Sequence, residues 1–172
     1  CGCCAGELGK APPGAGDVVR AAFFAGARTR LELAATARDY FCEALVHEGV
    51  HDPDRAAQSF LCAAWACDDT KAATQARICR ERAAEMLRLA IARGEVRMPR
   101  EVAFAVLADI ERRARRFEQA LEACDEAEWA LEGVDADDER DATWAVIAYL
   151  RELAEADDDA CHSAAEAFAE PG

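Results

Sequence analysis

Residues 101–134 read EVAFAVLADIERRARRFEQALEACDEAEWALEGV and decide the fold class of this chain. Apolar residues recur at intervals of three and four on both sides of an arginine-rich stretch, which is the periodicity of two helices separated by a turn. Alanine has the highest helix propensity, and its small side chain lets two helix axes approach closely. The segment therefore predicts two antiparallel helices, about Arg100–Arg115 and Phe117–Leu131, joined by a short turn.

The same periodicity extends over most of the chain and predicts an all-α fold of antiparallel helix pairs, either a right-handed tetratricopeptide-like array or a helical bundle. Gly49 is expected to take the left-handed position that ends a helix, and Gly94 ends another. Residues 1–16 are rich in Cys, Gly and Pro and predict an irregular arm, and residues 17–172 predict one helical domain. The other expected helices are Asp17–Gly49, Asp54–Cys67, Lys71–Arg93, Glu139–Ala154 and a final one from Asp157 to just before Pro171.

The composition favours a soluble, cytoplasmic protein. With 172 residues, 52% of them hydrophobic, the chain is long enough to form one core. No apolar run approaches the roughly 18 residues that a membrane span needs, and no signal peptide is visible. Five of the nine cysteines fall at apolar helical positions, which favours reduced thiols packed as small hydrophobic groups in a reducing compartment: Cys42, Cys62, Cys67, Cys79 and Cys124.

The charge of the chain is concentrated at its C-terminal end. The formal net charge is -14, yet residues 117–172 alone carry -16, and the remainder carries +2. Lys10 and Lys71 are the only lysines. Three interpretations of this acidic, lysine-poor composition are open: adaptation to a high-salt cytoplasm, the codon bias of a GC-rich genome, or a face that attracts a basic partner. In each case the chain is a poor general nucleic-acid binder, which leaves a protein or peptide as the expected partner.

Three segments fit the spacing of a tetratricopeptide unit of about 34 residues, with large apolar residues near positions 4 and 7 and small residues near 8, 20 and 27. Small residues let the second helix approach the first, and the aromatic residue fills the gap between them. The unit that starts at Glu101 is the best fit, a second starts at Asp141, and a looser one starts at Ala57. The residues in these roles are Phe104, Leu107, Ala108, Ala120 and Ala127; Trp144, Ile147, Ala148, Ala160 and Ala167; and Phe60, Ala63, Ala64, Ala76 and Ala83.

A Cys-rich start, a break, an Ala63-Ala64-Trp65 segment and the later Arg-Phe-Glu-Gln-Ala-Leu at 116–121 together resemble an uncharacterised prokaryotic family. That family joins a small zinc ribbon to a tetratricopeptide-like domain, and the similarity covers about residues 28–170. The family's ribbon has two cysteine pairs, whereas this sequence has one, at Cys1 and Cys4. Because no activity is established for the family, the resemblance implies an architecture and no chemistry.

His47-Glu48-Gly49-Val50-His51 matches the His-Glu-x-x-His pattern of zinc proteases, in which two histidines one helical turn apart bind zinc and the glutamate activates water. A zinc-dependent hydrolase is therefore one functional hypothesis. A second is a structural zinc held by Cys1, Cys4, His47 and His51, which would fasten the N-terminal arm to the first long helix. The third is a frayed helix end without metal, which Gly49 and the following Asp-Pro favour.

One concentrated basic run lies at the turn inside residues 101–134. Its four arginines could grip a carboxylate-rich peptide or a phosphate, or they could pair with Glu111, Glu118 or the acidic C-terminal segment. Stacked helix pairs form surfaces that dock proteins, so the favoured function is a non-catalytic interaction module. The candidate partner-binding residues are Arg112, Arg113, Arg115 and Arg116.

Overall fold

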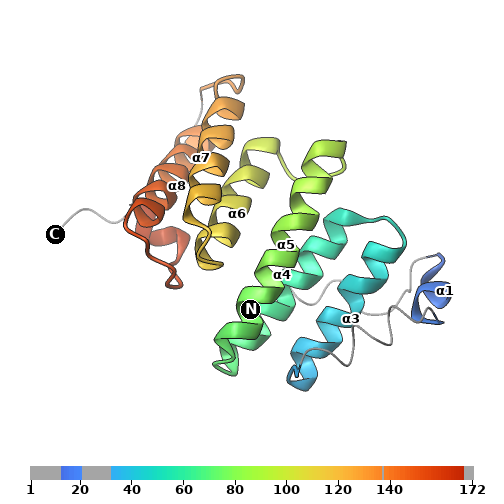
Figure 1. The fold of residues 1–172 in the computed structure, drawn as a ribbon. Coiled ribbons are helices and arrows are strands. Elements are labelled where there is room, and N and C mark those ends of the chain that lie inside the picture. Colours follow the sequence, from blue (N-terminus) through green and yellow to red (C-terminus); the bar gives the residue numbers. More distant parts are fainter. Residues whose placement is uncertain (1–12, 21–31, 137, 169–172) are drawn as a thin grey trace. The chain divides into compact units, whose positions relative to one another are not determined.

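The computed structural model describes residues 13–20, 32–136 and 138–168, and within them the chain is entirely helical (Figure 1). These residues form seven α-helices and one short 3₁₀ helix, with no strand among them. The all-α prediction is confirmed. By packing, the chain divides into two compact units, unit 1 (Cys1–Ala90) and unit 2 (Ile91–Gly172), which are described one at a time.

Unit 1 contains α1 (Ala15–Arg20), α3 (Ala35–Gly49), α4 (Pro53–Asp69) and the part of α5 (Ala73–Arg93) up to Ala90. Its core is centred on Phe60 of α4, whose side chain is fully buried. The ring of Phe41 from α3 meets that of Phe60 edge to face at 5.2 Å, and the Arg82 guanidinium of α5 lies 5.4 Å from the Phe60 centroid. One aromatic side chain therefore contacts both neighbouring helices.

Unit 2 contains α6 (Arg100–Arg113), α7 (Phe117–Leu131), α8 (Asp138–Glu155) and the 3₁₀ helix η1 (Ala164–Phe168). Helix α6 packs against both α7 and α8, α7 packs against α8, and η1 packs against α8. Small and branched apolar side chains fill the space between the three long helices, as the alanine-rich sequence predicts. The buried residues include Leu107, Ala108, Ala120, Cys124, Ala127, Leu131, Ile147 and Leu150.

Three helix connections have the same three-residue length and the same hydrogen bonds. They join α3 to α4, α4 to α5 and α6 to α7, and in each a residue other than glycine takes a left-handed φ: His51 (63°), Lys71 (58°) and Arg115 (63°). The amide of that residue donates to the carbonyl three residues earlier, and the next amide donates to the carbonyl five residues earlier, at 2.8–3.0 Å. This is the Schellman arrangement, which satisfies the last carbonyls of a helix.

The expectation that Gly49 takes the left-handed position is wrong, because Gly49 is the last residue of α3 and His51 takes that conformation. The start of the next helix explains the shift. Pro53 occupies the first turn of α4, and the Asp52 carboxylate accepts a hydrogen bond from the Arg55 amide, so the chain reversal has to finish immediately before Asp52. Gly49 has a different role: a Cβ there would lie 2.6 Å from Val18, so glycine lets α1 approach the end of α3.

Lys71→Gly is expected to raise the free energy of unfolding of unit 1 by about 0.5–1 kcal/mol, because glycine takes a left-handed φ without the clash that a Cβ causes. Gly94→Ala is the converse change and is expected to cost about 1 kcal/mol, since Gly94 has a φ of 68° and no atom lies within 4 Å of the added Cβ. Urea unfolding followed by circular dichroism measures both. A loss of stability in Lys71→Gly would contradict the conformational explanation.

The helix predicted from Asp157 onward is wrong for residues 157–168, which form only the 3₁₀ helix η1. Local hydrogen bonds explain the difference. Asp157 takes a left-handed φ of 54°, which ends α8, and the Asp158 carboxylate accepts from the Ala160 amide at 2.7 Å. Glu166 then accepts from the amide of Ser163 at 2.8 Å, so helical structure begins again only after Ser163.

The three proposed repeat segments differ in packing. The five key residues of the Glu101 segment and of the Ala57 segment are all buried. In the Asp141 segment only Ile147 is buried, whereas Trp144, Ala148 and Ala160 are exposed, so the packing roles expected of those three residues are wrong. The helix pairs α4–α5 and α6–α7 therefore have the burial that a tetratricopeptide unit needs, and α8 has a different environment.

Candidate interaction surface

The His-Glu-x-x-His segment does not lie on one continuous helix. His47 is buried within α3, and its Nε2 lies 3.9 Å from Glu43, whereas His51 is exposed and lies beyond the end of the helix with a φ of 63°. Both carboxylate oxygens of Glu48 accept from the Arg82 guanidinium, at 2.7 and 2.8 Å. The glutamate that would activate water in a protease is thus in an ion pair with α5, and the imidazoles are not one helical turn apart.

Cys1 and Cys4, the other two ligands of the predicted structural zinc, lie outside the described residues. Within residues 13–20, 32–136 and 138–168, no group of three or more His, Cys, Asp or Glu side chains is arranged to hold a metal ion. The zinc site of Cys1, Cys4, His47 and His51 therefore stays a prediction.

The four arginines of the basic run have different environments in unit 2. Arg112 is 1% exposed, and its guanidinium donates to the Asp109 carboxylate at 2.7 Å and to the carbonyl of Asp158. Arg115 is exposed and donates to Asp159 at 2.7 Å. Arg116 is half-buried and lies 3.2 Å from the buried Glu111 carboxylate, while Arg113 is half-buried at the end of α6.

These contacts connect the basic run to its own unit. Arg112 and Arg115 hold the segment after α8 against the end of α6, and Arg116 compensates a carboxylate that is removed from water. The sequence left two interpretations of these arginines open, binding of an acidic ligand and pairing with acids of the same chain. The contacts with Glu111 and with the C-terminal segment agree with the second. Arg112 is not accessible to a partner at the surface.

The cysteines of the core are thiols with little access to solvent. Cys67, Cys79 and Cys124 are buried, and Cys42 and Cys62 are half-buried. Burial raises the pKa of the Cys79 thiol to about 12 and that of Cys124 to about 11. Because a protonated thiol is a poor nucleophile, these side chains act as small apolar groups that fill the interior.

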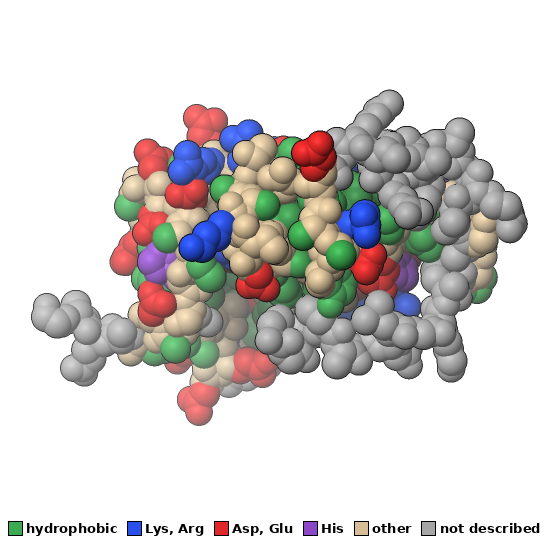
Figure 2. Space-filling model, turned by 90° about the horizontal axis from the view of Figure 1, so that it is seen from below, with side chains coloured by type: hydrophobic (Ala, Val, Ile, Leu, Met, Phe, Trp, Pro, Cys, Tyr) green, Lys and Arg blue, Asp and Glu red, His purple; other side chains and the backbone are tan. Residues whose placement is uncertain are grey.

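The outward faces of α7 and α8 each carry an exposed tryptophan. Trp129 of α7 is 64% exposed and Trp144 of α8 is 46% exposed, although tryptophan is among the side chains that gain most from burial. Exposed acidic residues lie on the same two helices, and Figure 2 shows Asp and Glu side chains spread over the surface that unit 2 forms, at the left of the view. The exposed acids on the two helices are Glu118, Glu122, Asp125, Glu126, Asp138, Glu139, Asp141, Glu152 and Glu155.

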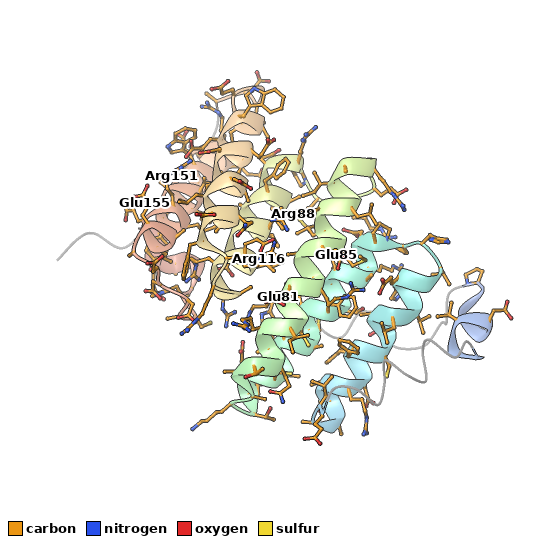
Figure 3. The ribbon with its side chains drawn as sticks, in the orientation of Figure 1. Glu81, Glu85, Arg88, Arg116, Arg151 and Glu155 are labelled. Carbon is orange, nitrogen blue, oxygen red and sulfur yellow. The ribbon has the colours of Figure 1, made fainter. Side chains whose placement is uncertain are left out.

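One arginine joins the two helices. Arg151 of α8 donates to Asp125 at 2.7 Å and to Glu128 at 3.1 Å, both on α7 (Figure 3 labels Arg151 and the nearby Glu155). The hydrogen bond with Asp125 is the largest cause that raises the pKa of Arg151, so the guanidinium is charged at every accessible pH. The pair α7–α8 is therefore fixed by charge as well as by its apolar core.

Sequence reasoning missed a cluster around His162 in unit 2. The His162 Nδ1 lies 2.8 Å from Glu166 and its Nε2 lies 3.0 Å from Asp158, while the Tyr149 hydroxyl donates to Glu166 at 3.2 Å. The signal was present as Asp, His and Glu at successive intervals of four residues, 158, 162 and 166. The cluster fastens η1 to α8.

Protonation of His162 and ionisation of Glu166 stabilise each other. Hydrogen bonds to Glu166 and then to Asp158 raise the pKa of His162 above its ordinary 6.5. The Ser163 amide, followed by His162, lowers the pKa of Glu166 from 4.5 to about 2. The His162 contribution to stability is present below pH 6.5 and is lost as the pH rises through its raised pKa. The Glu166 contribution is present above pH 4.5 and is lost as the pH falls toward its lowered pKa.

The attachment of η1 is therefore expected to be strongest between about pH 4.5 and 6.5. Glu166→Gln removes the main cause of the raised pKa of His162 and is expected to lower that pKa. NMR titration of the His162 ring protons measures the change. Glu152→Gln, an exposed acid of α8 outside the cluster, is the control and is expected to leave the titration unchanged. An unaltered His162 titration in Glu166→Gln would contradict this assignment.

Comparison with known proteins finds no match to a family model, to a curated protein or to a solved structure. None of the helices in the described part of the chain is long and apolar enough to cross a membrane.

Proposed function

We infer that this chain is a non-catalytic protein–protein interaction module, and that the outward faces of α7 and α8 in unit 2 are its docking side. The observation that carries this proposal is the exposure of Trp129 and Trp144 on neighbouring helices. Exposed tryptophan is enriched at the centres of protein interfaces because one rigid side chain buries a large apolar area.

The build of unit 2 supports this role. The three long helices enclose a well-filled core, and Arg151 fixes α7 against α8, so the two tryptophans project from a rigid support. A rigid support lowers the entropy that is lost on binding. The tetratricopeptide-like architecture is a further part of this proposal, supported by the two helix pairs whose key positions are buried.

Site-specific photo-crosslinking tests the docking side. A photoreactive phenylalanine analogue is placed at Trp129 or Trp144, with exposed Thr74 of α5 in unit 1 as the matched control position. In extract from the native host, we expect crosslinked products from positions 129 and 144 and none from position 74. Excess unmodified chain should compete for these products, and the Trp129→Ala/Trp144→Ala chain should not.

Two results would overturn the proposal. One is that neither tryptophan position gives a crosslink, although a control shows that the analogue is photoreactive under the same conditions. The other is crosslinking that the double alanine variant competes as well as the unmodified chain does, because the tryptophans would then contribute nothing to binding.

A further inference from the structure

The exposed residues of α7 form one narrow stripe along the helix. At 100° per residue, positions 118, 122, 125, 126 and 129 fall within an arc of about 100°, opposite the buried face. Four of these positions are acidic and the fifth is Trp129. We name the stripe the α7 face; it consists of Glu118, Glu122, Asp125, Glu126 and Trp129.

The carboxylates of the α7 face are mostly not compensated within the described residues. Asp125 pairs with Arg151, but in the part of the chain that the structure describes no basic side chain pairs with Glu118, Glu122 or Glu126. Helix α7 itself contains no basic residue. Successive glutamates four residues apart repel one another by about 0.2–0.5 kcal/mol per pair, so a cation placed along this stripe would relieve an existing repulsion.

Trp129 is an independent sign that a ligand is accommodated on this face. It is the most exposed of the large hydrophobic side chains among the described residues, and it lies in the last turn of α7 on the same stripe as the acids. The face of an indole ring attracts a guanidinium or an ammonium group, most strongly of all the aromatic rings. A row of carboxylates that ends in a tryptophan therefore suits a ligand with several cations in a row.

We propose that the α7 face binds a Lys- or Arg-rich segment of another protein, with one cation stacked on Trp129 and others paired with Glu118, Glu122 and Glu126. From residue 118 to residue 129 the helix rises about 17 Å. An extended peptide of about five or six residues covers that length. This inference rests on the proposed interaction function and specifies the class of partner.

Fluorescein-labelled octa-arginine is the probe, and its anisotropy with the full chain is measured at 150 mM NaCl. Glu118→Gln/Glu122→Gln/Glu126→Gln is expected to weaken binding by about 10-fold or more, because three close carboxylates are neutralised. Asp141→Asn/Glu152→Gln/Glu155→Gln on α8 changes the net charge equally and is expected to weaken binding by less than about 3-fold. Trp129→Ala should weaken binding by about 5-fold, and Trp144→Ala by less than about 2-fold. Circular dichroism confirms that each variant is folded.

Equal losses in the α7 and α8 triple variants would overturn the proposal, because octa-arginine would then be attracted only by the overall negative charge. Absence of octa-arginine binding would also overturn it. If crosslinking at Trp129 and Trp144 still occurs and is competed as described above, the interaction function stands and only the basic partner class is wrong. If crosslinking fails as well, both proposals are wrong.

Discussion

Phe60→Ala is expected to lower the free energy of unfolding of unit 1 by about 3–5 kcal/mol, the range for truncating a fully buried phenylalanine. Phe60 is completely buried, meets Phe41 edge to face and lies under the Arg82 guanidinium. Its removal leaves a cavity that borders three helices. Helices cannot close such a space without moving apart from their other contacts, so little of the loss is recovered by relaxation.

Urea unfolding of this variant is best followed in a chain with Trp129→Phe and Trp144→Phe. The sequence has three tryptophans, so Trp65 of α4 is then the only one left, and its fluorescence reports on unit 1. Arg55→Ala, at an exposed position of the same helix, is the control and is expected to change the stability by less than about 1 kcal/mol. A Phe60→Ala chain as stable as its parent would show that the α3–α4–α5 core is not centred on this ring.

Arg112→Met is expected to lower the stability of unit 2 by about 2–4 kcal/mol. Methionine has a similar length and fills the apolar part of the site, but it donates no hydrogen bond. The carbonyl of Asp158 and the Asp109 carboxylate would both lose the guanidinium that they contact, and the segment after α8 would lose its buried attachment to α6.

Arg115→Met is the matched comparison, because Arg115 is three residues further on and pairs with the adjacent Asp159. Its side chain is 65% exposed, so water compensates the lost ion pair and the expected cost is below about 1 kcal/mol. Urea unfolding by circular dichroism, together with hydrogen exchange of the Asp158 amide, measures both variants. Equal stability of the two variants would contradict a structural role for the buried arginine.

The extent to which the sequence predicts this fold depends on how local each signal is. Phe117–Leu131 was predicted with its observed bounds, and the start at Arg100 was also correct. Apolar residues recur in both helices with a strong helical period. Pro99 precedes the start of α6, and the turn at Arg115 precedes the start of α7. The preference of glycine for a left-handed φ points to Gly49 after α3, but Pro53 and Asp52 begin the next helix and place that conformation at His51.

The surface was harder to predict than the helices. Arg112 is one of four arginines within five residues, and its burial depends on Asp158, which is 46 residues away in the sequence. Trp144 fits a core position by spacing, yet it is exposed, and among the described residues after α8 the chain forms only the short 3₁₀ helix η1 instead of a second long helix. A pattern within one helix cannot reveal whether a covering helix exists, whereas the burial of Phe104 follows from the helix pair in which it lies.

The recurring three-residue turns determine where the chain can change in length. An inserted residue at 50–52, 70–72 or 114–116 would break both hydrogen bonds that close the turn and rotate the next helix out of its contacts. The connections at 94–99 and 132–136 are mostly exposed and are not closed by that paired motif. Epitope tags, labels or natural insertions should therefore be tolerated in these two loops and excluded from the three turns, which gives an experimenter two positions for attaching a reporter to unit 2.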